Sequence, residues 1–393
     1  MTYKNSYKGN WILLKNNISN NDYFSELCEE VSNFYGYCIV YSGTKSWKPK
    51  GNINFTKGPF YNKKSLVTKF LSWINYFLGS FFFLAGQKKS ANLFIINSPP
   101  FLSALGYLFN KIFGMNYIIW VDDVYPDVLS SRNFISKNGF IEYVWNTFNK
   151  IIYRNATHVI TISHFMEKKI SSKMGSSKNY DKINIIPTWV DTNEIYPIKK
   201  KDNPFAIKYN QVDKITIMYS GNFGSTHDTR SLVKVAEALQ DITEINFFFI
   251  GEGQEFEKLR NKYRLRNTVY LPWQPRSNLK FSLSCADIGL VTLKKGMGQL
   301  SMPSKTYYYM AAGAAVMGVS EVDSNLNFLI EKHKCGFNFP PDKFDKIINK
   351  ILFYRENKNI LLEHQNLSRK FVMKSVSKDI CLKQVLKLMK SSI

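Results

Sequence analysis

Short, uninterrupted apolar runs recur along the whole chain and set its fold class. They read WILLKN from residue 11, YCIVYS from 37, NLFIIN from 92, YIIWVD from 117, HVITIS from 158 and INIIPT from 183, and then ITIMYS from 215, INFFFIG from 245, TVYLPW from 268, DIGLVTL from 287 and AAVMGVS from 314. Runs without polar alternation are typical of strands covered on both faces, as in parallel sheets with crossover helices. Between 229 and 240, Leu232, Val235 and Leu239 recur at helical spacing. The pattern predicts an α/β protein.

The chain has 393 residues, more than one hydrophobic core usually supports, so two domains are expected. The polar stretch 197–214 interrupts the periodicity and is the predicted linker. We expect a Rossmann-like domain at 1–200 and a second at 201–393, with parallel sheets facing across a cleft. Beyond Pro340 the pattern is helical and basic, and the last helix could reach back to the first domain.

The net charge of +23 is unevenly placed. Val31 to Val121 contains no Asp or Glu but ten lysines. A solvated basic face, an anionic lipid surface and nucleic acid are the alternative explanations. RNP, zinc-finger and helix-turn-helix signatures are missing from the sequence, so nucleic acid is not the expected partner.

Phe70 to Gly86, FLSWINYFLGSFFFLAG, carries no charge. A spanning helix needs about 20 apolar residues, and polar residues interrupt this one. We favour a helix in the membrane interface, with Trp73 and Phe77 in lipid and flanking lysines on headgroups. Those lysines are Lys63, Lys64, Lys69, Lys88 and Lys89. A buried core helix is an equal alternative, and a transmembrane span is the third.

The five cysteines form no CxxC pair and no zinc-like spacing, which is typical of a reduced, cytosolic protein. The N-terminus lacks the pattern of a signal peptide. We expect a cytoplasmic protein, peripheral on the inner face of the cell membrane.

Two segments of the second half can hold phosphate. In YSGNFGSTHDTRSL a strand ends at Tyr219, and Gly221 and Gly224 allow a tight turn before a helix. In PSKTYYYMAAG, Ser304 and Lys305 would project from a helix start, which favours an anion. A purely steric role for the glycines and a solvated lysine are the alternatives. GEGQEF from Gly251 fails the GxGxxG fingerprint, and no GxxxxGK[ST] loop occurs, so dehydrogenases and P-loop ATPases are disfavoured.

Eight segments in order resemble glycosyltransferase family 4: DDVYPDVL (122–129), HVITISHFMEKKI (158–170), INIIPTWVD (183–191), YSGNFG (219–224), FIGEG (249–253), ADIGLVTL (286–293), PSKTYYYMAAG (303–313) and CGFNF (335–339). The likeness is strongest to bacterial enzymes of O-antigen, capsule and colanic acid assembly, including N-acetylfucosaminyl transferases. It implies a GT-B fold and transfer with retention from a nucleotide sugar, usually a UDP-sugar, without a metal. A lipid-linked saccharide would be the acceptor.

By the same resemblance, one set of residues would bind the donor: Gly221, Asn222, Phe223, Gly224, Gly251, Glu252, Gly253, Leu271, Pro272, Ser304, Lys305 and Tyr308. The family's E-x7-E signature would fall at Leu300 and Tyr308, neither of them acidic. The arginine and lysine frequent after the glycine loop are replaced by His227 and Asp228, so Lys305 would be the principal cation on the phosphates.

Asp122, Asp123 and Asp127 follow the YIIWV strand, where ligands of open α/β sheets collect. The expected catalytic residues are Asp123 or Asp127, orienting the acceptor hydroxyl, and Lys305. Alternatively, these aspartates cap the next helix or pair with Arg132. Adjacent aspartates followed by Val124 do not form a DxD motif, so no metal is expected.

Of the histidines, only His164 is a candidate for the site. Three functions are therefore weighed: a membrane-associated transferase, a catalytically inert relative that binds a nucleotide sugar or a partner, and a basic nucleic-acid-binding protein.

Overall fold

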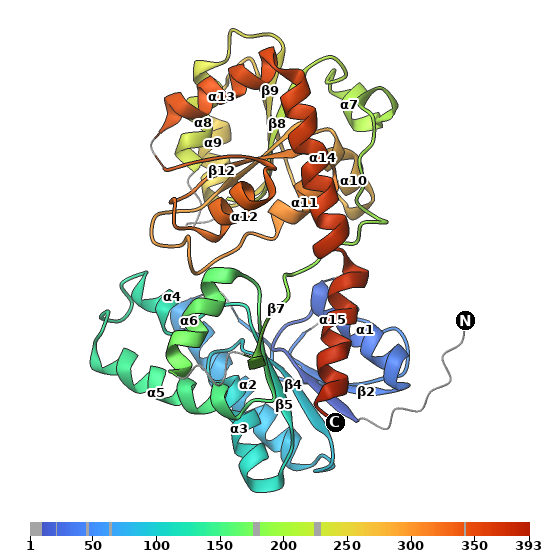
Figure 1. Ribbon diagram of the computed structural model, residues 1–393, viewed down its shortest axis with the longest axis vertical. Coiled ribbons are helices and arrows are strands. Elements are labelled where there is room, and N and C mark those ends of the chain that lie inside the picture. The colour runs from blue at the N-terminus through green and yellow to red at the C-terminus, as the bar shows by residue number, and fades with distance from the viewer. Residues whose placement is uncertain are drawn as a thin grey trace. The chain divides into compact units, whose positions relative to one another are not determined.

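The computed structural model describes residues 10–20, 22–44, 47–62, 65–175, 181–223, 229–341 and 343–393. It divides into two compact units (Figure 1). Unit 1 comprises residues 1–187 and 381–393, and unit 2 comprises residues 188–380.

Unit 1 is built on a seven-stranded sheet in the order β3-β2-β1-β4-β5-β6-β7, with every neighbouring pair parallel. Its elements are β1 (Trp11–Leu14), α1 (Tyr23–Tyr35), β2 (Cys38–Ser42), β3 (Ile53–Lys57), α2 (Leu66–Ala85), β4 (Asn92–Ile96), α3 (Leu102–Phe113), β5 (Tyr117–Val121), α4 (Asp127–Ser130), α5 (Phe140–Asn155), β6 (His158–Thr161), α6 (His164–Met174), β7 (Ile183–Ile185) and α15 (Lys378–Ser391). The crossovers β3-α2-β4, β4-α3-β5 and β5-α5-β6 run the same way across the sheet. Right-handed crossovers therefore put α2, α3 and α5 on one face.

Unit 2 has a parallel six-stranded sheet in the order β10-β9-β8-β11-β12-β13. Its elements are η2 (Lys200–Asp202), α7 (Pro204–Lys208), β8 (Ile215–Asn222), α8 (Thr229–Ala238), β9 (Ile245–Glu252), α9 (Gln254–Lys262), β10 (Thr268–Leu271), α10 (Arg276–Ser284), β11 (Ile288–Thr292), α11 (Lys305–Ala311), β12 (Ala315–Val319), α12 (Asn325–His333), β13 (Gly336–Phe339), α13 (Phe344–Glu356) and α14 (Lys358–Ser375). The core between this sheet and its helices includes Tyr219, Phe223, Phe247 and Phe249. The two parallel sheets confirm the predicted fold class.

The predicted boundary at residue 200 differs from the observed division. Residues 200–208, expected in a linker, fold onto unit 2 as η2 and α7. The Asn203 side chain accepts from Phe205 N, capping α7, and donates to Phe281 O at 2.9 Å. Lys200 also pairs with Asp287. These tertiary contacts hold a polar segment that has no apolar period of its own.

The C-terminal helix α15 belongs largely to unit 1. Its Cys381, Val385 and Met389 are buried, and Ser392 O accepts from Asn116 Nδ2 at 2.9 Å. The second predicted domain therefore ends before residue 393, because the apolar side of α15 covers the first sheet.

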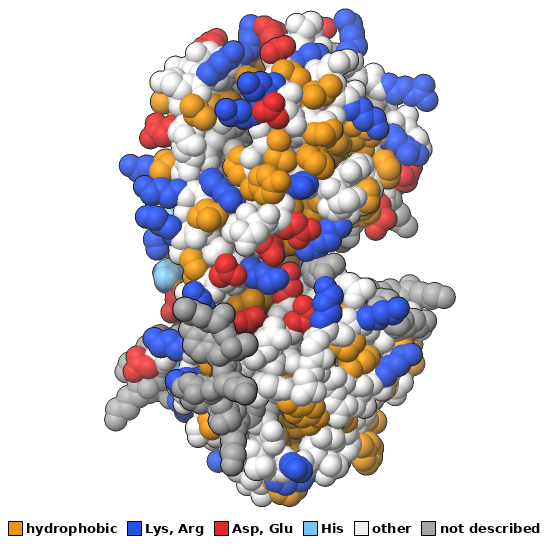
Figure 2. Space-filling view, turned by 90° about the vertical axis from the view of Figure 1, so that its right-hand side faces the viewer, with side chains coloured by type: hydrophobic (Ala, Val, Ile, Leu, Met, Phe, Trp, Pro, Cys, Tyr) orange, Lys and Arg blue, Asp and Glu red, His pale blue; other side chains and the backbone are white. Residues whose placement is uncertain are grey.

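Basic charge is not confined to one unit. Figure 2 shows Lys and Arg side chains distributed over the surface of each unit. The acid-free segment 31–121 nevertheless lies wholly in unit 1.

Candidate functional site

The carboxyl ends of β8 and β9 and the start of α11 form one cluster in unit 2. The two strands pair through their last residues, Gly221 with Gly251 and Asn222 with Glu252. Both glycines have a φ of +152°. A Cβ at Gly251 would lie 2.0 Å from Gly221 O, and a Cβ at Gly221 would lie 2.5 Å from Lys305 Nζ. Glycine at both positions therefore allows the strand ends and the lysine to approach.

Lys305, the first residue of α11, has a buried ammonium group. Its Nζ lies 3.7 Å from the centroid of the Tyr219 ring, a cation–π contact. Within the described part of the chain, Nζ has no hydrogen-bond partner. Burial lowers the pKa of Lys305 to about 7. Burying an amine without a partner is unfavourable, so this arrangement is suited to receiving an anionic ligand.

Two tyrosines that sequence reasoning missed hold this cluster together. Ser220 N donates to the Tyr309 hydroxyl at 2.5 Å, which fixes α11 against β8. A Cβ at Gly289 would lie 2.3 Å from Tyr309 Cγ, so the glycine of β11 admits the ring. Tyr219 contacts Lys305 and donates to Asn222 O at 3.2 Å. The available signal was the position of Tyr219, two residues before Gly221.

The other predicted donor residues lie at or next to the same edge of the sheet. Phe223 N donates to Glu252 O at 3.0 Å, so the two strand ends continue side by side. Gly253, with a φ of +125°, precedes α9. Leu271 pairs with Ile250, and Pro272 follows it. Gly224 lies outside the described residues.

The start of α11 shows how this chain departs from the E-x7-E signature. Ser304 is the exposed N-cap residue, and its side chain makes no capping hydrogen bond. Tyr308 is half-buried, whereas Leu300 is buried. The position of the first glutamate is therefore an apolar packing position here.

In unit 1, Asp122 and Asp123 follow β5 but have different surroundings. Trp120 Nε1 donates to Asp122 Oδ1 at 2.7 Å, and the Tyr23 hydroxyl donates to Oδ2. Asp123 is exposed at the surface, yet enough protein surrounds its carboxyl group to desolvate it. This desolvation, followed by the charge of Asp122, raises the pKa of Asp123 to about 6. Asp123 is thus the carboxyl group that a ligand can reach.

Basic and aromatic side chains surround Asp123. The charges of Arg132 and Lys69 oppose the rise of its pKa. Lys69 Nζ lies 4.9 Å from the centroid of the Trp73 ring, which is 6.4 Å from the centroid of Tyr125. Cations and aromatic rings around one carboxyl group suit a ligand that carries both phosphate and sugar.

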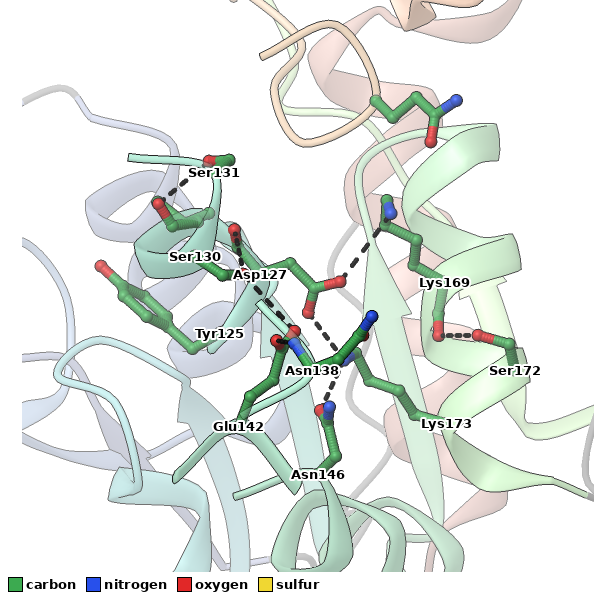
Figure 3. Close-up of polar contacts among 12 residues, drawn as sticks. Tyr125, Asp127, Ser130, Ser131, Asn138, Glu142, Asn146, Lys169, Ser172 and Lys173 are labelled. Carbon is green, nitrogen blue, oxygen red and sulfur yellow. Dashed lines mark hydrogen bonds and ion pairs between the residues drawn. The ribbon is translucent and has the colours of Figure 1, made fainter. Parts of the chain in front are cut away.

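Asp127 lies at the start of α4 and is held by α6 (Figure 3). Its carboxylate is 2.6 Å from Lys173 Nζ and 3.8 Å from Lys169 Nζ. Lys173 also donates to Asn146 Oδ1 at 2.5 Å. The ion pairs connect α4 to α6, which is a structural task. His164 pairs locally, with Nδ1 3.2 Å from Glu167 Oε2.

The residues expected at a membrane all belong to α2 or its flanks. Trp73 and Phe77 are half-buried, and Lys88 is exposed. Lys89 donates to Leu84 O at 2.9 Å and Ala85 O at 2.7 Å, so it caps the helix. Lys63 and Lys64 lie outside the described residues. Other side chains of α2 form its exposed side.

Comparison with known proteins gives the following likenesses. No protein-family model matches the sequence. The chain is 24% identical over 294 residues to the probable glycosyltransferase WbjE of Pseudomonas aeruginosa, covering 73% of this chain and 72% of WbjE. It is 25% identical over 358 residues to the putative colanic acid biosynthesis glycosyl transferase WcaI of Escherichia coli K12, covering 88% of this chain and 86% of WcaI.

Solved structures share the fold. Sucrose-phosphate synthase from Thermosynechococcus elongatus matches with a TM-score of 0.75 and 14% identity, covering 98% of this chain and 99% of that one. Anabaena HepE in complex with UDP-glucose matches with a TM-score of 0.69 and 12% identity, covering 97% of this chain and 99% of HepE.

Proposed function

We propose that this chain, a glycosyltransferase of the GT-B fold similar to glycosyltransferase family 4, transfers a sugar from a UDP-sugar to a saccharide linked to polyprenyl diphosphate. The transfer retains the anomeric configuration and serves the synthesis of a surface polysaccharide. The observation that supports the choice of donor is the Lys305 ammonium, which has no hydrogen-bond partner among the described residues and lies beside the paired Gly221 and Gly251. The HepE complex contains UDP-glucose, and the name of WcaI refers to colanic acid biosynthesis, both of which support this choice.

In the reaction, the bond between the anomeric carbon and the diphosphate breaks, and its electron pair leaves with UDP. The acceptor oxygen forms the new bond on the face of the sugar that the diphosphate leaves, which retains the configuration, and its proton passes to a base, which we assign to Asp123. Protonated Lys305 stabilises the charge on the departing diphosphate. Asp127 already pairs with two lysines, so Asp123 is the better choice for the acceptor hydroxyl.

The proposed place of action is the cytoplasmic face of the membrane, where a polyprenyl-linked acceptor would lie. Three features support it. The five cysteines are buried and none of them forms a disulfide, which suits a reducing compartment. The acid-free segment 31–121 would attract anionic lipid. Lys69 and Arg132 lie near Asp123 and could hold the acceptor's diphosphate.

A thermal-shift screen against UDP-sugars, GDP-sugars and other nucleotide sugars tests the donor. We expect stabilisation by a UDP compound, weakened in Lys305→Ala. Radiolabelled donor with membranes and a lipid-linked acceptor then tests transfer. If the protein binds a nucleotide sugar but transfers no sugar to any common acceptor, it is an inert relative. If no UDP compound stabilises it, the donor assignment is refuted.

A further inference from the structure

Unit 1 carries an unusual share of exposed apolar side chains. Among the described residues, 16 of the 28 exposed large apolar side chains lie between Val67 and Ile151. Most of them belong to α2, α3 and α5, which cover one face of the first sheet (Figure 1). A soluble protein rarely exposes so many apolar groups on adjacent helices unless they bind something.

The helix α2 has two distinct sides. Its exposed large apolar residues are Val67, Phe70, Leu71, Ile74, Leu78 and Phe82. Successive members are one, three or four residues apart, so they lie on one side of the helix. On the other side, Tyr76 and Ser80 are buried, and the Tyr76 hydroxyl donates to Tyr41 O at 2.8 Å.

Length and composition alone would allow Val67–Ala85, with a mean hydropathy of 1.2, to cross a membrane. The buried side packs against protein, which argues against a lipid-surrounded span. The exposed side argues against a core helix.

The apolar surface continues from α2 to α3 and α5. The ring centroids of Phe81 and Phe109 are 5.9 Å apart, which joins α2 to α3. Phe101, the N-cap residue of α3, stacks on Trp145 of α5 with centroids 4.1 Å apart. On α5, Phe140 is 81% exposed. We call the exposed apolar residues of α2, α3 and α5 the three-helix face.

The exposed charged side chains on α2, α3 and α5 and directly after them are positive. Neither α2 nor α3 contains Asp or Glu. Glu142, the acid of α5, is buried and accepts from Asn138 N at 2.6 Å. Lys88, Lys111 and Lys150 are exposed on these helices or directly after them. An apolar surface bordered by cations is complementary to anionic lipid.

We infer that the three-helix face docks unit 1 on an anionic bilayer, with the apolar side chains among the acyl chains and the lysines at the headgroups. This inference rests on the membrane location in the proposed function and deepens it by naming the surface that makes the contact. It also extends the expected membrane contact from one helix to three.

Co-sedimentation of the full chain with vesicles tests docking. The variants are Val67→Ser/Leu78→Ser/Phe82→Ser on α2 and Phe140→Ser/Ile141→Ser on α5. The matched control on unit 2 is Val322→Ser/Leu362→Ser/Phe328→Ser, where Val322 is 67% exposed and Val67 is 68% exposed. We expect the wild type to bind vesicles that contain phosphatidylglycerol more tightly than vesicles of pure phosphatidylcholine. Affinity for the phosphatidylglycerol vesicles should be about tenfold or more weaker in both face variants and unchanged in the control.

Unchanged vesicle binding in either face variant would overturn the proposal that the three-helix face docks on the bilayer. So would a face variant that only converts a dimer to a monomer in light scattering, because a second copy would then be the occupant. UDP binding, measured in parallel, reports on the donor site and separates the two proposals.

A second measurement serves if a multiple variant fails to fold. Phe82→Cys, labelled with an environment-sensitive fluorophore, should shift its emission to the blue on anionic vesicles, whereas Val322→Cys should not. The native cysteines are buried and should resist labelling. Equal emission from the two labelled variants would contradict docking.

Discussion

Gly221 lies directly against the ammonium group of Lys305: a Cβ at this position would be 2.5 Å from Nζ. The glycine therefore does more than permit a turn. It lets a lysine from the start of α11 reach the strand ends, where amides can share a phosphate with the cation. The turn glycine and the cation, two separate sequence signals, thus form one site.

Gly221→Ala should disrupt this site. The added methyl group must displace Lys305, and a φ of +152° is unfavourable for alanine. We expect UDP-sugar affinity to fall by at least about tenfold and stability by about 1–3 kcal/mol. Calorimetric titration and urea unfolding measure the two effects. The control is Gly296→Ala, because Gly296 has a φ of +82° but no atom within 4 Å of an added Cβ. An equal affinity loss in both variants would contradict the steric explanation.

Donor affinity should depend on pH through Lys305. The pKa of the free amine is about 7, and phosphate contact favours the charged form, which raises the pKa in the complex. Affinity should therefore fall as pH rises above about 7, by up to about tenfold per pH unit. Titrations in buffers of different ionisation enthalpy should show proton uptake on binding at pH 8. Affinity that is independent of pH, or equally pH-dependent in Lys305→Met, would rule out this role.

Lys305→Met should stabilise the protein while it abolishes donor binding. Because burial lowers the pKa of Lys305 from 10.5 to about 7, the folded chain binds fewer protons than the unfolded chain between these values. The stability of the wild type should therefore rise with pH in this window. We expect the variant to be more stable by roughly 2–4 kcal/mol at pH 6 and by less at pH 9. Urea unfolding checks this, with the exposed Lys294→Met as control.

Asp123→Asn should separate transfer from donor binding. Without the carboxylate, transfer should drop by about 10²- to 10⁴-fold, while UDP-sugar affinity stays near that of the wild type. In the wild type, kcat/KM for the acceptor should fall as pH drops below about 6, because the carboxyl group becomes protonated. Pre-steady-state transfer and equilibrium titration make the comparison. A fully active Asn variant would remove Asp123 from the mechanism.

Asp127→Asn should act mainly on stability. The change leaves Lys173 without its carboxylate partner at 2.6 Å, which should cost about 1–3 kcal/mol in free energy of unfolding. We expect kcat to change by less than about threefold, since Asp127 is already engaged by lysines. The double variant Asp127→Asn/Lys173→Met should lose less stability than the single changes add up to. A hundredfold loss of kcat in a folded Asp127→Asn variant would show that Asp127 has a catalytic role.

The strands were predictable where both faces are covered. The runs at 92–96, 117–121, 215–222 and 245–252 became central strands because continuous apolar sequence marks two-sided burial. β3 (Ile53–Lys57) was missed, since this edge strand is half-exposed and its sequence INFTK has no continuous apolar run. β13, GFNF, was missed for the same reason.

The sequence alone determined which residue types and turns this protein has: the glycines after two buried strands, the lysine at a helix start, the acid-free segment and the apolar helix. These features are local, and periodicity and turn chemistry reveal them. Only the tertiary structure decided that the Lys305 ammonium lies buried against Gly221, that Asp127 is held by α6 and that α2 exposes one side beside α3 and α5. Pairing and desolvation depend on residues brought together from distant parts of the chain, which no local pattern specifies.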